Sequence, residues 1–164
     1  MPGPVRANNP ADILELATAR IGEVVPNADL SAFALAFTLV RASERITYEN
    51  ERVYKPMGWS WPGFRVLFWI WLLGPLEPRQ IAALASSSRA SISSALNTLE
   101  RNGFVQRSRS SADRRLVKVE LTEEGSERMV EALAAANGRE RELVAGFSAD
   151  ERRTLTELLT RILV

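Results

Sequence analysis

Apolar residues recur at helical spacing through most of this chain of 164 residues. Near the N-terminus, Asn9 can cap a helix that Pro10 begins, and apolar positions continue the pattern to about Gly22. A longer pattern starts near Asp29 and runs to about Tyr54, which predicts a helix of about 40 Å. This length exceeds what a domain of this size needs internally. We therefore expect part of the second helix to pack against a partner chain.

A third helix is predicted between Ser60, whose hydroxyl can cap it, and Gly74. Its most apolar stretch, Val66 to Leu73, is eight residues long. A membrane-spanning helix needs roughly 20 apolar residues. We therefore expect a buried helix and no membrane partner.

The C-terminal part of the chain predicts two more helices. Thr122 can cap the first, whose apolar residues we place on one face: Met129, Val130, Leu133 and Ala136. Ser148 and Glu151 form a capping box for the second. Its apolar residues recur at spacings of three and four: Leu155, Leu158, Leu159, Ile162 and Leu163. The chain thus ends on an amphipathic helix whose apolar face needs cover.

Between these helical regions lies a pair of short predicted helices. Pro78 starts the first, Ser88 caps the second, and Gly103 follows its end. Ala85-Ser86-Ser87 supplies a turn of the length that a helix-turn-helix uses. The expected inward-facing residues are apolar: Ile81, Ala82 and Leu84 in the first helix, and Ile92, Ala95, Leu96 and Leu99 in the second.

The outer face of the second short helix is polar and free of acidic residues. It carries Arg89, Ala90, Ser93, Ser94, Asn97 and Arg101. Small and hydrogen-bonding side chains suit a surface that enters a major groove and touches base edges and phosphates. By itself, the segment fits an ordinary helical hairpin with a polar face equally well.

The next segment decides between these interpretations. Residues 104–107 and 116–121 are strand-like, and a polar loop with Arg109, Arg114 and Arg115 lies between them. Arginines on a projecting strand pair can enter a minor groove, where the negative potential is strong in narrow A-tracts. We therefore predict a winged helix-turn-helix over residues 77–125 that binds duplex DNA.

Composition and charge narrow the function classes. The chain has no Cys and no His, which removes disulfides, thiolate metal sites, a cysteine redox switch and the commonest general base. It also lacks a nucleophile motif and a glycine-rich phosphate loop. We therefore expect neither an enzyme nor a bound metal or cofactor, and an enzyme with carboxylate or serine chemistry is the weakest alternative.

The net charge of +1 is unevenly distributed. From Arg89 to Lys118 there are seven basic and two acidic side chains, so this region carries +5 and the rest of the chain is acidic. Such a basic centre is typical of a phosphate-binding surface, although a solvated basic loop would look the same. The first residues lack the apolar core of a signal peptide, so we expect a cytoplasmic protein.

The region around residues 80–125 resembles the DNA-binding part of the MarR family of bacterial transcription regulators. The most specific motifs are Asp113-Arg114-Arg115 and Val119-Glu120-Leu121-Thr122-Glu123-Glu124-Gly125, which resemble the wing of that family. Ser88-Arg89-Ala90-Ser91 and Leu99-Glu100-Arg101-Asn102-Gly103 resemble the start and end of its recognition helix. Ser86, Ser87 and Ser94 depart from its usual residues, so we expect the wing to carry more of the binding.

The resemblance implies a mainly α fold with a small β-hairpin wing. It implies one domain over residues 1–164, with a winged helix lobe at 60–121 and a helical dimerisation lobe from 9–56 and 122–164. It further implies that Arg115 reaches the minor groove and that Asp113 orients the neighbouring arginines, although Asp113 also suits a local turn. The candidate DNA contacts are Ser88, Arg89, Ser91, Ser93, Ser94, Asn97, Arg109, Asp113, Arg114 and Arg115.

An aromatic cluster follows the second helix, and its candidate ligand-pocket residues are Trp59, Trp61, Phe64 and Phe68. By resemblance it lies between the two lobes, where the family often binds small aromatic or amphipathic effectors. For any single one of these residues, core packing is the favoured interpretation, because aromatic residues at helical spacing usually belong to the core. We thus expect a homodimeric repressor of a pseudo-palindromic operator, relieved by a small aromatic ligand. The alternative is a winged-helix protein-interaction module that does not bind DNA.

Overall fold

The computed structural model describes residues 9–109 and 117–163. The chain divides into two compact units, Met1–Tyr48 and Glu49–Val164. The long helix α2 contributes residues to both units.

The first unit consists of helix α1 (Pro10–Val24) and the greater part of α2 (Leu30–Tyr54), as the sequence predicted. The Asn9 side chain caps α1 by accepting a hydrogen bond from a backbone N–H of its first turn. The Asp29 carboxylate accepts the backbone N–H of Ala32 at 2.9 Å and thereby caps α2. This hydrogen bond and one from the Ser31 hydroxyl at 2.7 Å hold the pKa of Asp29 below its usual value.

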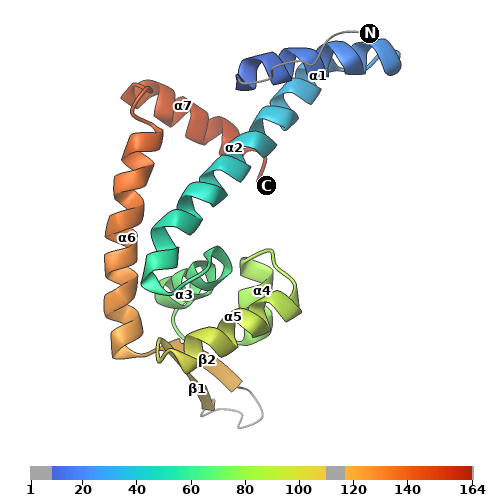
Figure 1. Ribbon diagram of the computed structural model, residues 1–164. Helices are drawn as coiled ribbons and strands as arrows, with labels where there is room; N and C mark the ends of the chain where they lie inside the picture. The colour runs from blue at the N-terminus through green and yellow to red at the C-terminus, as the bar shows by residue number, and fades with distance from the viewer. Residues whose placement is uncertain (1–8, 110–116, 164) are drawn as a thin grey trace. The chain divides into compact units, whose positions relative to one another are not determined.

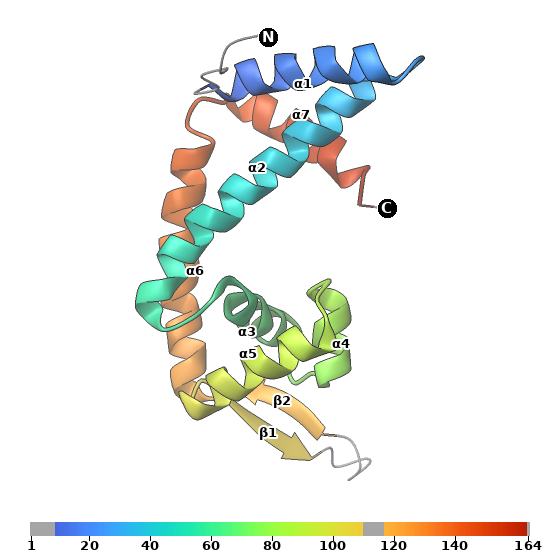
Figure 2. The same cartoon turned by 45° about the vertical axis from the view of Figure 1, so that its right-hand side comes forward.

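The second unit is built around three helices and a hairpin, which are labelled in Figures 1 and 2. Helix α3 (Trp61–Leu73) contacts both α4 (Pro78–Leu84) and α5 (Arg89–Arg101). Strands β1 (Val105–Arg109) and β2 (Val117–Leu121) form an antiparallel pair, and β1 contacts α5 whereas β2 contacts α3. This is the predicted arrangement of two short helices followed by a strand pair.

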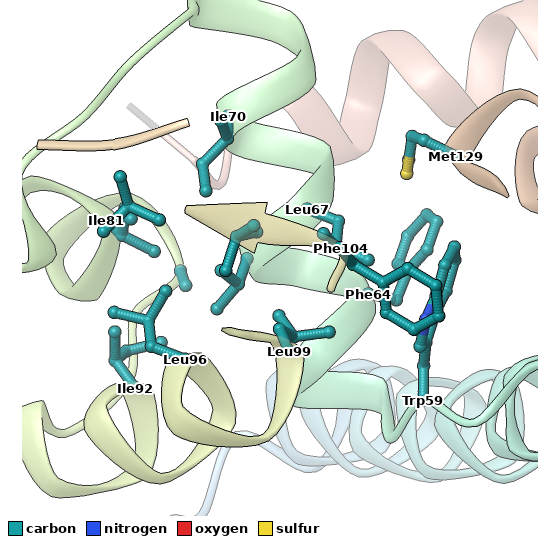
Figure 3. Close-up of a cluster of buried hydrophobic side chains, with 14 of the residues drawn as sticks. Trp59, Phe64, Leu67, Ile70, Ile81, Ile92, Leu96, Leu99, Phe104 and Met129 are labelled. Atoms are coloured by element: carbon teal, nitrogen blue, oxygen red, sulfur yellow. The ribbon is translucent and has the colours of Figure 1, made fainter. Parts of the chain in front are cut away.

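A continuous apolar core joins these elements. Figure 3 shows side chains from α3, α4, α5 and α6 in one cluster, together with Trp59 and Phe104. The largest fully buried members are Tyr54, Val66, Leu67, Ile81, Ile92, Leu96, Leu99, Val119 and Met129. Burying each such side chain stabilises the fold by about 1.5–3 kcal/mol. The core therefore holds the inner face of α5 and leaves its outer face to solvent.

The hairpin is anchored to the helices by backbone hydrogen bonds. Val105 pairs with Leu121 at its base, and the register continues to Arg109 opposite Val117. Leu76, between α3 and α4, exchanges two backbone hydrogen bonds with Val119 at 3.0 and 2.8 Å. The body of the domain thus fixes the base of the wing.

The remaining elements complete the second unit and correct several sequence expectations. A short 3-10 turn (Lys55–Met57) follows α2, and α6 (Glu123–Leu143) and α7 (Ala149–Thr160) follow the hairpin. Leu84 and Val130, which we expected to face inward, are exposed. Ala132 takes the place of Val130 in the core because it lies three residues from Met129, one turn further along α6. Helix α7 ends at Thr160, before Ile162 and Leu163, which we had assigned to its apolar face.

The mainly α fold with a small β-hairpin is confirmed. Among the described residues, no helix is both long enough and apolar enough to cross a membrane.

Candidate nucleic-acid interface

Helix α5 is fixed at its start and along its inner face. The Ser88 hydroxyl accepts the backbone N–H of Ser91 at 3.1 Å, so the predicted cap is present. Ile92, Leu96 and Leu99 are 1–2% exposed. Because these residues leave the helix no freedom to rotate about its axis, the opposite face points outward in a defined direction.

The predicted contact residues of α5 gather on this outward face. Arg89, Ser93, Ser94 and Asn97 are exposed, whereas Ser91 is half-buried. The Ser88 hydroxyl is engaged as the cap, although it keeps its own proton for donation. The serines leave room for a close approach, and Asn97 and Arg89 are the longer hydrogen-bonding side chains of the face.

Strand β1 supplies a cation that the sequence analysis did not select. The Arg107 Nε donates to Glu100 at 3.0 Å, and its Nη2 donates to the Oδ1 of Asn97 at 3.3 Å. Both acceptors, the Glu100 carboxylate and the Asn97 side-chain amide, lie on α5. Glu100 therefore does not present an unpaired negative charge beside the outer face, which matters for any surface that approaches phosphates.

Two hollows flank α5. One, of about 400 Å³, is lined by Pro78, Arg79, Arg89, Ser93, Leu96 and Arg107. The other, of about 380 Å³, is lined mainly by small and hydroxyl-bearing residues of α5 and of the segment before α3, including Ser60, Ser91, Ser94 and Thr98. The first hollow is cationic and the second is nearly neutral.

Arg79 and Arg107 bring further positive charge to the cationic hollow. The pairing of Arg107 with Glu100 could not be read from the sequence, because the two residues meet only when the chain reverses at Gly103 and β1 runs back along α5. The positive φ of 79° at Gly103 permits this reversal. Arg79 is paired with Glu77 at 2.7 Å.

Four of the predicted DNA contacts lie in the wing beyond Ser108. Asp113, Arg114 and Arg115 lie outside the described residues. For Arg109 the structure describes the backbone, as the last residue of β1, and not the side chain.

The aromatic residues separate into two groups. Trp61, Phe64 and Phe68 line a cavity of about 570 Å³, together with Asn50, Tyr54, Arg65, Trp69, Leu133, Ala136, Asn137 and Glu140. The Tyr54 and Phe64 rings stack at 4.0 Å between centroids. Trp59 does not line this cavity. It is buried against Phe104, with the rings edge to face at 5.5 Å.

Tyr54 is the titratable residue most affected by this cavity. Burial raises the pKa of its hydroxyl to about 12, and the negative charge of Glu140 acts in the same direction. The hydroxyl therefore remains a hydrogen-bond donor at neutral pH. In the described ranges, 9–109 and 117–163, no group of His, Cys, Asp or Glu side chains is placed to hold a metal ion.

A helix pair with an exposed second helix, followed by an anchored hairpin, defines a winged helix-turn-helix protein. A sequence model of the MarR family matches residues 59–117. The regulator YwaE of Bacillus subtilis, named as an uncharacterised HTH-type transcriptional regulator, is 35% identical over 84% of this chain and 81% of its own length. The chain belongs to the MarR family.

A second sequence relative and a solved structure with the same fold also resemble this chain. The HTH-type transcriptional repressor YetL of Bacillus subtilis is 25% identical over 84% of this chain and 83% of its own length. A crystal structure of a mutant MarR from E. coli, complexed with operator DNA, matches with a TM-score of 0.72 and 22% identity over 88% of this chain and 98% of that chain. The protein is thus a MarR-family transcription regulator, and at the level of the family it is not an enzyme.

Proposed function

We propose that this protein is a homodimeric repressor that binds a pseudo-palindromic operator in duplex DNA. The observation that carries the proposal is the outward face of α5, capped at Ser88, held by three buried apolar residues and flanked by the cationic hollow. A recognition helix needs this combination of a rigid inner face and an exposed polar outer face. The mutant E. coli MarR with the same fold is complexed with operator DNA, and YetL is named a repressor, which supports the same role here.

A dimer is supported by uncovered apolar faces. No residue of α1 or α7 is buried within the chain. Large apolar side chains of these helices and of α2 are exposed, including Leu16, Leu35, Val40, Leu155 and Leu158. A soluble protein seldom leaves such faces open to water, so a second copy is the partner that symmetry favours.

The dimer would place two copies of α5 in successive major grooves, about 34 Å apart. The wing arginines Arg109, Arg114 and Arg115 would then lie over the flanking minor grooves, with Asp113 orienting them. On α5, we assign contacts with bases and phosphates to Arg89, Ser93, Ser94 and Asn97, with Ser88 and Ser91 at the start of the helix.

The aromatic cavity supports regulation by a small aromatic ligand. Planar rings of Trp61, Phe64 and Phe68 can stack on such a ligand. Arg65 also lines the cavity, and its Nη1 lies 3.5 Å from the Ser87 hydroxyl in the turn that precedes α5. A ligand that draws Arg65 away from Ser87 would therefore alter the support of α5, which would couple the cavity to DNA binding. Trp59, buried against Phe104, would report on such a change without touching the ligand.

Selection of bound sequences from random duplex DNA tests the main proposal. We expect a two-fold symmetric consensus with half-sites one helical turn apart. Affinity for the selected site should fall steeply with salt, because bound phosphates release counterions. If the protein selects no sequence and polyanions do not compete for its binding surface, the winged helix instead serves as a protein-interaction module.

The contribution of the wing has its own test. Arg115→Ala should weaken binding to the selected operator by about 1–3 kcal/mol, with Arg128→Ala on the outer surface of α6 as the control. Equal binding by Arg115→Ala and the parent protein would remove the wing from the proposal.

The ligand part is tested by titrating the protein with small phenolic compounds while tryptophan fluorescence and operator binding are recorded. A ligand of the cavity should change both signals, and Phe68→Ala should weaken the response. If neither signal changes with any compound, the aromatic residues serve only as packing.

A further inference from the structure

Arg107 joins the wing strand β1 to the outer face of α5. Its guanidinium spans two acceptors on the helix, with Nε 3.0 Å from the Glu100 carboxylate and Nη2 3.3 Å from the Oδ1 of Asn97. The side chains of Arg107 and Glu100 are 41% and 40% exposed, so solvent reaches the edge of this cluster while the contact between them remains. The planar fork of arginine suits such a two-acceptor contact.

The contact fixes more than the position of Asn97. A guanidinium has only donors, so the amide atom that faces Arg107 must be the oxygen. The amide nitrogen of Asn97 then lies on the side away from β1. Without Arg107, the amide could rotate by half a turn and exchange its acceptor with its donor.

The orientation of this amide has a direct meaning for base recognition. An asparagine reads adenine in the major groove by accepting from N6 and donating to N7, and the order of these two groups across the groove is reversed between A·T and T·A. An amide held in one orientation therefore matches one of them. An amide that is free to flip can present its acceptor and donor in either order, so it favours neither arrangement.

We propose that Arg107 is a positioning residue that holds the Asn97 amide in one orientation and so sets the order in which α5 presents an acceptor and a donor to the base edges. The inference rests on the proposed function, namely DNA binding through α5. Arg107 need not touch DNA for this role.

Glu100 completes the arrangement. Its carboxylate accepts from Nε, beside the Nη2 that donates to Asn97, and so helps to hold the guanidinium in place. It also offsets the positive charge of Arg107. This distinguishes Arg107 from Arg89, its neighbour in the cationic hollow, for which no acidic partner is found among the described residues.

The experiment compares sequence selection by the parent protein with selection by three variants. Asn97→Ala identifies the base pair that Asn97 reads, because the preference there should fall by roughly 5- to 150-fold. Arg107→Met should relax the preference at that same base pair, with A·T and T·A becoming nearly equal. In the double variant, Arg107→Met should add nothing at that base pair to the effect of Asn97→Ala.

Two controls separate positioning from charge and from folding. Arg128→Met removes an exposed arginine of α6 that also lies 3.0 Å from a carboxylate, and it should leave the consensus unchanged. Arg107→Lys keeps the charge, but one ammonium does not hold both acceptors. It should therefore relax the same base pair while affinity for random duplex stays within about twofold, and it carries the test if Arg107→Met does not fold.

The outcomes are distinct. If Arg107→Met weakens all sequences equally and lowers the salt dependence by about one counterion, Arg107 contacts a phosphate and the positioning role is wrong. If it leaves both the consensus and the affinity unchanged, the role is also wrong. If the parent protein selects no sequence, the proposed function itself fails.

Discussion

Ser86 occupies the turn between α4 and α5 with a φ of 44°, in the left-handed region that favours glycine. For a residue with a Cβ this conformation costs about 1 kcal/mol. We expect Ser86→Gly to raise the free energy of unfolding by about that amount, as measured by urea denaturation. Ser86→Ala, which keeps the Cβ, should not stabilise the protein, and an equal gain from both substitutions would contradict the explanation.

Tyr54 should make the stability of the protein depend on pH. Its pKa in the folded protein is about 12, against 10.0 in its ordinary state, because it is buried and Glu140 lies near. Between these values the unfolded chain loses the tyrosine proton and the folded chain keeps it, so unfolding becomes easier as pH rises from about 10 to about 12. The free energy of unfolding should fall over this range in the parent protein and fall less in Tyr54→Phe.

A difference absorbance titration at 295 nm checks the same assignment. The parent protein minus Tyr54→Phe should show one tyrosinate forming at about pH 12. A difference curve centred near pH 10 would mean that water solvates the hydroxyl and that Tyr54 is not buried.

At the scale of elements, the wing and α6 meet at a close backbone contact. Thr122 caps α6 by accepting the backbone N–H of Gly125 at 3.0 Å, and its own hydroxyl donates to the Gly103 carbonyl at 2.6 Å. A Cβ on Gly125 would overlap the carbonyl oxygen of Phe104, so either the strand or the helix must move. The hairpin and α6 are thus joined rigidly, which suits a wing held at a fixed angle.

We expect Gly125→Ala to lower the free energy of unfolding by about 1–3 kcal/mol or more, since overpacking strains the backbone. Gly138→Ala is a matched control on the same helix, because nothing lies within 4 Å of its added Cβ. That control should stabilise the protein by up to about 1 kcal/mol through helix propensity. Equal effects of the two substitutions in thermal or urea denaturation would contradict the close contact.

At the scale of the whole molecule, the proposed dimer rests on uncovered apolar faces. Helix α7 carries Leu155 and Leu158 on one face, 42% and 50% exposed. We expect the parent protein to sediment as a dimer and its melting temperature to rise with concentration. Leu158→Lys should shift the protein to a monomer. Operator binding should then weaken, because a monomer carries one copy of α5 and can contact only one half-site.

Thr160→Lys is the control for that substitution. It adds the same charge to the same helix but on the opposite side. Thr160 follows Leu158 by two residues, and each residue turns the helix by about 100°. This variant should remain a dimer. A monomeric parent protein, or dissociation by both variants alike, would contradict the assignment of this face to the interface.

The sequence alone determined the order and approximate bounds of the elements, because periodicity, caps and turn residues are local properties. Asn9, Ser60, Ser88, Thr122 and Ser148 all cap the helices that were predicted from them. It also determined the family, since motifs of the helix pair and the wing lie close together in the chain. The exposed face of α5 followed from the same periodicity.

Only the tertiary structure decided which residues meet across elements. It separated Trp59 from the aromatic residues that line the cavity, because Trp59 packs on Phe104, a residue 45 positions later in the chain. It exposed Leu84 and Val130, whose burial depends on the neighbouring elements rather than on helical spacing. It also brought Arg107 to Glu100 and Asn97, because the reversal at Gly103 sets a strand against a helix face. Such contacts are set by packing between elements, which no local pattern encodes.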